Sequence, residues 1–116
     1  GWRTVEAPLD LPAALAAAAG DEVVLIDCAT LWLTNHLLAD NDLAVEAEAL
    51  VAALAACAAP IIVVSNEVGW GIVPDNALSR QFRDAQGRLN QRLAAEAGLV
   101  VTVIAGLPLV LKGQLP

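Results

Sequence analysis

Two groups of polar residues each follow a short apolar run, and their types suit the binding of nucleotide phosphates or a metal ion. Asp27 comes directly after residues 23–26, and Ser65, Asn66 and Glu67 follow residues 61–64. A carboxylate at such a place holds Mg²⁺ beside nucleotide phosphates, directly or through water. Many α/β strands instead end in an aspartate that only caps the next helix. The pattern alone leaves both roles open for Asp27.

The residues after Glu67 form a glycine-bearing loop, VGWGIVP, that precedes a predicted helix. Gly69 and Gly71 allow the backbone to turn sharply or to approach a ligand closely. The segment therefore suits the wall of a binding site, and the alternative is a surface loop with a packed Trp70.

Four of the six basic residues lie on one predicted helix: Arg80, Arg83, Arg88 and Arg92. Guanidinium groups bind phosphates and carboxylates well. Arginines opposite an apolar stripe are also typical of the solvated side of a helix, and a subunit interface is a further alternative.

The remaining reactive side chains favour structural roles. His36, the single histidine, falls within a predicted apolar helix, where a helix-surface or packed histidine without a catalytic role is expected. Cys28 and Cys57 form no CxxC pair, so reduced thiols in apolar surroundings are expected and a zinc site is not. The sequence contains no GxxxxGK[ST] phosphate loop, and Lys112 is its only lysine.

The elements that must position these residues alternate between helices and strands. Apolar runs with β-branched residues predict strands at residues 23–26, 61–64 and 99–104, with a short edge strand near 109–111 and another near 3–6. Helices are predicted from Asp10 to Gly20, over 30–38 and 44–58, and from Asp75 or Asn76 to Ala97. The order predicts one α/β domain with a mostly parallel sheet, strands buried on both faces and helices on both sides.

Composition excludes several other classes. The 116 residues carry a net charge of −7, which disfavours binding to nucleic acid. Hydrophobic residues make up 58%, but no uninterrupted apolar stretch reaches the roughly 18–20 residues of a membrane span.

Several segments together resemble one enzyme family, the bifunctional adenosylcobinamide kinase/adenosylcobinamide-phosphate guanylyltransferases. The matching segments are WRTVE at residues 2–6, VVLIDC at 23–28, LTN at 33–35, NEVGWGIVP at 66–74 and FRDAQGRLNQRLA at 82–94. The resemblance covers essentially the whole chain, and the last two segments are its most specific part.

The resemblance implies a three-layer P-loop fold of the RecA-like type and two activities. Such enzymes phosphorylate adenosylcobinamide with ATP or GTP, and then transfer GMP from GTP through a guanylylated histidine to give adenosylcobinamide-GDP. Cytoplasmic homotrimers using Mg²⁺ are expected. The family's phosphate loop and guanylylated histidine precede the WRTVE segment. Residues 1–116 are therefore expected to be the C-terminal part of one domain, incomplete at its N-terminus and inactive on its own, and His36 does not match the nucleophile.

Carried over residue by residue, the resemblance implies GTP contacts for Glu6 and Asp27. Asp27 stands where the family also uses the longer Glu, so it would contact Mg²⁺ either directly or through water. It further implies a place near the site or at a subunit interface for six residues: Asn66, Glu67, Gly69, Arg83, Asn90 and Arg92. A nucleotide-dependent transferase is therefore the leading hypothesis. The alternatives are a non-catalytic nucleotide-binding or assembly module and another P-loop NTPase.

Overall fold

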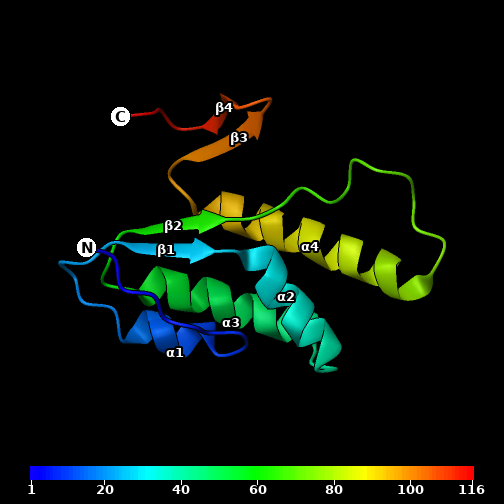
Figure 1. The fold of residues 1–116 in the computed structure, drawn as a ribbon, viewed down its shortest axis with the longest axis horizontal. Helices are drawn as coiled ribbons and strands as arrows, with labels where there is room; N and C mark the ends of the chain where they lie inside the picture. Colours follow the sequence, from blue (N-terminus) through cyan, green and yellow to red (C-terminus); the bar gives the residue numbers. More distant parts are fainter.

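A computed structural model describes residues 1–116 and contains four helices and four strands (Figure 1). The helices are α1 (Leu11–Ala16), α2 (Ala29–Leu38), α3 (Leu43–Ala56) and α4 (Ala77–Glu96). The strands are β1 (Val24–Asp27), β2 (Ile61–Val64), β3 (Val100–Ile104) and β4 (Leu107–Lys112). Strand formation at residues 3–6 was a wrong prediction, because residues 1–7 have no regular structure.

Side-chain caps explain where three helices begin. Asp10 accepts a hydrogen bond from the amide of Ala13, Asp42 from those of Ala44 and Val45, and Asn76 from that of Ser79. Each cap satisfies amide donors that lack a partner in the first turn of a helix. The predicted starts at Asp10 and Asn76 are confirmed.

The strands form two separate sheets of two strands each. β1 and β2 pair in parallel, with Asp27 opposite Val64, and β3 and β4 pair antiparallel. The parallel pair confirms the predicted α/β class for this part of the chain. The continuous, mostly parallel sheet is not formed, because β3 and β4 lie apart from β1 and β2 (Figure 1).

The hydrophobic core lies on one face of the β1–β2 pair, where all four helices meet. Its buried side chains are Leu11, Leu15, Ile26, Ala29, Trp32, Leu33, Leu43, Leu50 and Leu89. Along β1 and β2 burial alternates, so Leu25, Ile62 and Val64 on the opposite face are exposed. The prediction of strands buried on both faces is therefore wrong for the residues present, since no helix covers the second face.

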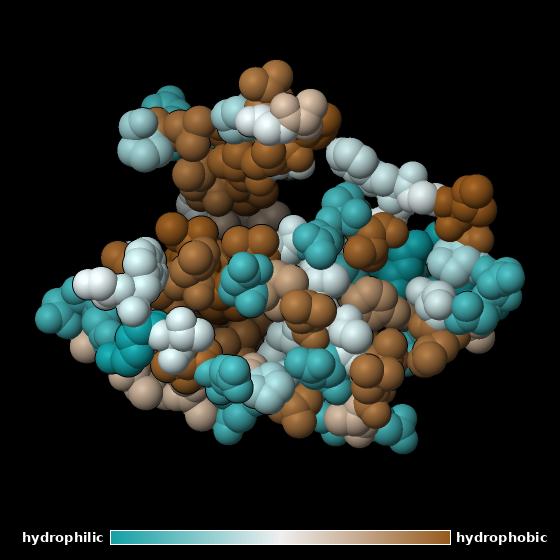
Figure 2. Space-filling model, viewed as in Figure 1, coloured by the Kyte–Doolittle hydropathy of each residue, from teal (hydrophilic) through white to brown (hydrophobic).

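Apolar residues also gather on the hairpin of β3 and β4. Every residue of β4 is exposed, as are Val103 and Ile104 of β3. In Figure 2 hydrophobic residues cover much of this hairpin and of the surface that faces it. The two sheets thus turn apolar surface toward the space between them.

Candidate functional site

Asp27 is the last residue of β1, and its side chain is exposed. The N-cap of α2 is the next residue, Cys28, and it makes no side-chain capping bond. Asp27 therefore does not cap α2. No hydrogen bond or ion pair holds its carboxylate, which remains free to bind a ligand at the end of the strand.

The second polar group lies at the same edge as Asp27. Because β1 and β2 are parallel and Asp27 pairs with Val64, the residues after Val64 emerge beside Asp27. Asn66 and Glu67 are exposed there, and the Glu67 carboxylate accepts a hydrogen bond of 3.3 Å from the amide of Gly69. The two polar groups thus lie at the carboxyl edge of the β1–β2 pair, which is the edge where open α/β sheets bind ligands.

Hydrogen bonds from two helices fix the end of β2. The amide of Asn66 donates to the Thr30 hydroxyl of α2 at 2.9 Å, and Asn90 of α4 donates to the Asn66 carbonyl at 3.1 Å. Ser65 donates to Asn90 Oδ1 at 2.6 Å, while Gln86 Nε2 lies 2.9 Å from both Ser65 Oγ and Asn90 Oδ1. We call these five residues, Thr30, Ser65, Asn66, Gln86 and Asn90, the strand-end network.

Sequence reasoning missed two members of this network. Thr30 and Gln86 are buried polar residues, and Gln86 Oε1 is buried without a partner. Gln86 precedes Asn90 by four positions, so the two share one face of α4. A polar pair at that spacing next to the apolar stripe was the signal that could have identified Gln86.

Glu6 lies in an irregular segment that extends alongside the domain. Arg3 forms an ion pair of 3.0 Å with Glu22, just before β1, and α2 binds the backbone of Pro8 and Leu9 beyond the end of β1. Glu6, between these anchors, is exposed and forms no ion pair or side-chain hydrogen bond. The structure thus records no direct contact that joins Glu6 to Asp27.

The arginine helix α4 binds its neighbours in different ways. Arg92 forms two hydrogen bonds, of 2.9 and 3.0 Å, with the Glu48 carboxylate of α3, and its guanidinium lies 3.5 Å from Glu96. The hydrogen bond from Arg92 and its positive charge lower the pKa of Glu48, and the same pairing raises the pKa of Arg92. Arg92 thus connects α3 to α4 in this structure.

Two surface grooves lie beside α4. One is lined by α3 and α4, and Arg88 and Arg92 contribute to it together with Glu48. The other runs between α2 and the start of α4 and includes Thr34, Pro74 and Arg83. Arg83 itself lies 3.6 Å from Asp84. Neither groove includes Glu6 or Asp27.

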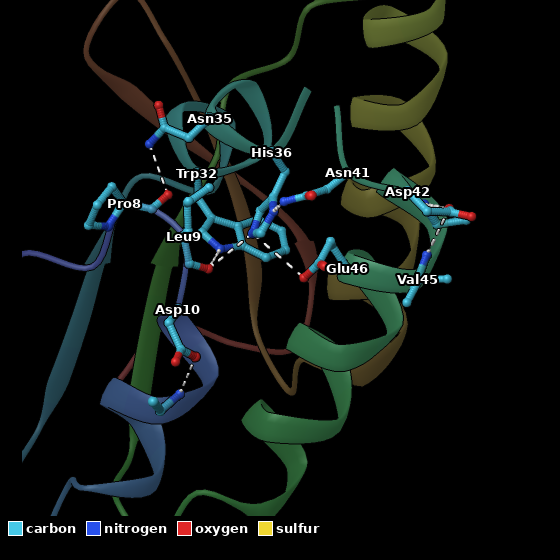
Figure 3. A network of polar contacts seen from close by, with 12 residues as sticks. Pro8, Leu9, Asp10, Trp32, Asn35, His36, Asn41, Asp42, Val45 and Glu46 are labelled. Atoms are coloured by element: carbon cyan, nitrogen blue, oxygen red, sulfur yellow. Dashed lines mark hydrogen bonds and ion pairs between the residues drawn. The ribbon is translucent and has the colours of Figure 1, made fainter. Parts of the chain in front are cut away.

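His36 is packed in the interior, as predicted. Its side chain is buried, and its ring stands edge-on to that of Trp32, with the centroids 4.8 Å apart. Both ring nitrogens have hydrogen-bond partners, Leu9 O for Nε2 and Asn41 for Nδ1 (Figure 3).

The residues present fit a magnesium ion that is bound mainly through a nucleotide. No group of three or more His, Cys, Asp or Glu side chains is placed to hold a metal by itself. Mg²⁺ bound with nucleotides needs only one or two carboxylates, because phosphates and water supply the other ligands. The free carboxylate of Asp27 meets that requirement.

The structure contains no helix that combines the length and the apolar character of a membrane span.

Comparison with known proteins gives one family. The chain is 47% identical to the bifunctional adenosylcobalamin biosynthesis protein CobP of Pseudomonas aeruginosa, over 97% of the chain and 67% of that protein. It is 40% identical to the bifunctional protein CobU of Salmonella typhimurium and 39% identical to that of Escherichia coli, over 96% of the chain and 70% of each relative. The family described as "Cobinamide kinase / cobinamide phosphate guanyltransferase" matches residues 1–111. The chain therefore belongs to the cobinamide kinase/cobinamide phosphate guanyltransferase family.

Proposed function

We propose that this protein phosphorylates adenosylcobinamide and then transfers GMP from GTP to adenosylcobinamide phosphate, giving adenosylcobinamide-GDP. The observation that carries the proposal is the family match over residues 1–111, which includes both polar groups at the carboxyl edge of β1 and β2. In the first reaction the substrate hydroxyl takes the γ-phosphoryl group of a nucleoside triphosphate. In the second, GTP gives up GMP and releases pyrophosphate.

The nucleotide is proposed to bind at this edge, with Glu6 and Asp27 as its carboxylate contacts. Asp27 supports the role because its carboxylate is exposed, unpaired and at the end of a parallel strand. When bound there, Mg²⁺ would neutralise phosphate charge, and Asp27 would hold it directly or through water. The strand-end network keeps Asn66 and Glu67 at the same edge, so Asn90 acts through Asn66.

Four further residues are proposed to lie near the site or at a subunit interface. Gly69 lies beside Glu67 and would shape the site wall, whereas Arg83 lines the groove next to the same loop. Arg92 pairs with Glu48 of α3, and Arg88 lines the groove beside that pair. That groove does not include Asp27, so a subunit interface is proposed for both arginines in place of a phosphate contact. A cytoplasmic homotrimer is proposed, and light scattering that gives three times the subunit mass would support it.

The fold proposal is a three-layer P-loop fold of the RecA-like type. β2 pairs only with β1 and β3 pairs only with β4, so each has a free edge. The exposed apolar face of β1 and β2 also lacks a cover. Further strands and helices at these surfaces would complete the sheet, and the chain spans 67–70% of the length of its relatives.

The test uses the enzyme in which residues 1–116 are joined to the phosphate loop and histidine that the resemblance implies, incubates it with labelled GTP, Mg²⁺ and adenosylcobinamide, and analyses protein and products by mass spectrometry. We expect adenosylcobinamide phosphate and adenosylcobinamide-GDP, and acid-labile GMP on the histidine that the resemblance puts before the WRTVE segment, with none on the buried His36. Free phosphate without either cobinamide product would instead identify an NTP hydrolase. Absence of GTP binding by the protein would identify a non-catalytic module.

A further inference from the structure

The two proposed nucleotide carboxylates come from segments of very different order. Asp27 is fixed by the β1–β2 pairing, whereas Glu6 lies in the irregular segment of residues 1–9. Such a segment has no secondary structure to define its path, so its location depends on the side chains that bind its backbone. Those side chains therefore decide where Glu6 lies.

Helix α2 binds this segment through three side-chain donors (Figure 3). Asn35 Nδ2 donates to Pro8 O, Trp32 Nε1 donates to Leu9 O, and His36 Nε2 lies at hydrogen-bond distance from Leu9 O; each distance is 3.0 Å. The donors come from successive turns of one helix, and the two acceptors are consecutive carbonyls. We call Trp32, Asn35 and His36 the α2 clamp.

Two members of the α2 clamp are held rigidly. Trp32 and His36 are each only 3% exposed. The Asn41 amide lies 2.9 Å from His36 Nδ1 and donates to it, which leaves the proton on Nε2 for Leu9 O. Glu46 Oε2, 3.7 Å from Nε2, adds a negative charge on the same side. His36 is thus oriented as a donor toward the segment.

Packing alone does not require these residue types. A leucine would fill a core position without bringing an N–H group that must find a partner. Here two buried ring N–H groups are directed at one backbone oxygen, three residues after Glu6. The two N–H groups thus hold the Leu9 carbonyl in place, close in sequence to Glu6, a proposed nucleotide contact.

The same helix begins two residues after Asp27. α2 therefore connects Asp27 at its start to the Glu6 segment, which contacts its first and second turns. We propose that Trp32, Asn35 and His36 are positioning residues, which keep Glu6 at a fixed distance from Asp27 so that one nucleotide can contact both. This proposal rests on the proposed function, since it takes Glu6 as a nucleotide contact.

The test compares the native enzyme with Trp32→Phe and with Trp32→Phe/His36→Phe, which remove one and two donors and keep aromatic rings. The first readout is the rate of trypsin cleavage after Arg3, because the protease must detach the segment to cut it. We expect faster cleavage there and an unchanged rate after Arg80. The second readout is steady-state kinetics, in which the KM for GTP rises about five- to tenfold per donor removed while kcat changes less than about twofold.

Two further variants separate positioning from lost stability. Leu54→Ala weakens the packing of α3 against the core without touching the clamp, and it should leave both readouts at their native values. Trp32→Phe/His36→Gln keeps an N–H donor at residue 36 and should restore much of the affinity lost between Trp32→Phe and Trp32→Phe/His36→Phe. The proposal is overturned if Leu54→Ala raises the KM as much as the clamp variants do, or if clamp variants keep the native KM.

Failure of the proposed function gives a different result. If Glu6→Gln has the native KM for GTP, Glu6 is not a nucleotide contact and the positioning role is refuted. The trypsin rates of the clamp variants would still show whether α2 holds the segment. If Glu6→Gln raises the KM but the clamp variants do not, the nucleotide contact stands and the clamp alone is refuted.

Discussion

Among single side chains, the pair of Glu48 and Arg92 gives a clear pH dependence. Arg92 donates two hydrogen bonds to Glu48 and lowers the pKa of that carboxyl in the folded state. A lowered folded pKa stabilises the protein above the unfolded value, roughly 4.3 for glutamate, and the stabilisation is lost as pH falls through the folded pKa. Arg92 stays charged throughout this range.

We therefore expect Arg92→Gln to reduce stability slightly at pH 7 and not at all at the acid end. The pair is exposed, so solvent screening keeps the effect small. Urea midpoints of the native protein and the variant, measured between pH 7 and pH 3, should converge as pH falls. Arg88→Gln, a change to an exposed arginine of the same helix, is the matched control. A constant difference across this range would contradict the assignment.

The strand-end network gives a second prediction for single residues. Asn90→Ala removes the donor to Asn66 O and the acceptor of Ser65 and Gln86. Because Asn90→Ala leaves partly buried polar groups unpaired, it should lower the free energy of unfolding by about 1–3 kcal/mol. Gln91→Ala, at the adjacent exposed position, should change stability by less than about 0.5 kcal/mol. Equal urea midpoints for the two variants would refute the role of the network.

The sequence predicted part of the site at this scale and missed part of it. Asp27 and Asn66 could be placed at one edge, because polar residues after apolar runs end parallel strands together. Gln86 was missed, because its partner Ser65 lies 21 residues away, and the four-residue spacing of Gln86 and Asn90 was the single local signal of its role. The path of residues 1–9 depends on side chains of α2, so no local pattern could reveal it.

At the scale of elements, helix positions were predicted well because caps and apolar spacing are local signals. Asn76 marks the start of α4, and Pro60 follows the end of α3. The burial of β1 and β2 was predicted wrongly for a physical reason. An unbroken apolar run indicates that both faces of a strand are buried, but it does not indicate which segment covers each face.

The core between the helices and the β1–β2 pair gives a prediction at this scale. Leu50 of α3 is fully buried, so Leu50→Ala should cost about 2–5 kcal/mol in the free energy of unfolding. Leu38→Ala removes a leucine that is 75% exposed at the end of α2, and it should cost less than about 0.5 kcal/mol. Chemical denaturation of both variants checks the difference, and similar losses would show that the core has been assigned wrongly.

For the whole molecule, the proposed three-layer fold requires a further layer on the uncovered face of the β1–β2 pair. Ile62 is 57% exposed in residues 1–116, and a lysine there would be harmless if that face met only water. If a further layer covers it in the working enzyme, Ile62→Lys buries a charge and should lower stability by at least about 2 kcal/mol. Leu38→Lys, on an exposed helix end, is the control. Equal thermal stability of the two variants would contradict a three-layer fold.

We propose above that GTP with Mg²⁺ binds at the edge formed by the ends of β1 and β2. Isothermal titration of GTP with and without Mg²⁺ tests it, using Asp27→Asn against Asp21→Asn, an exposed aspartate near the opposite end of the same strand. We expect Asp27→Asn to lower the Mg²⁺-dependent affinity for GTP about tenfold or more, and Asp21→Asn to bind GTP like the native protein. Native affinity and native Mg²⁺ dependence in Asp27→Asn would contradict it.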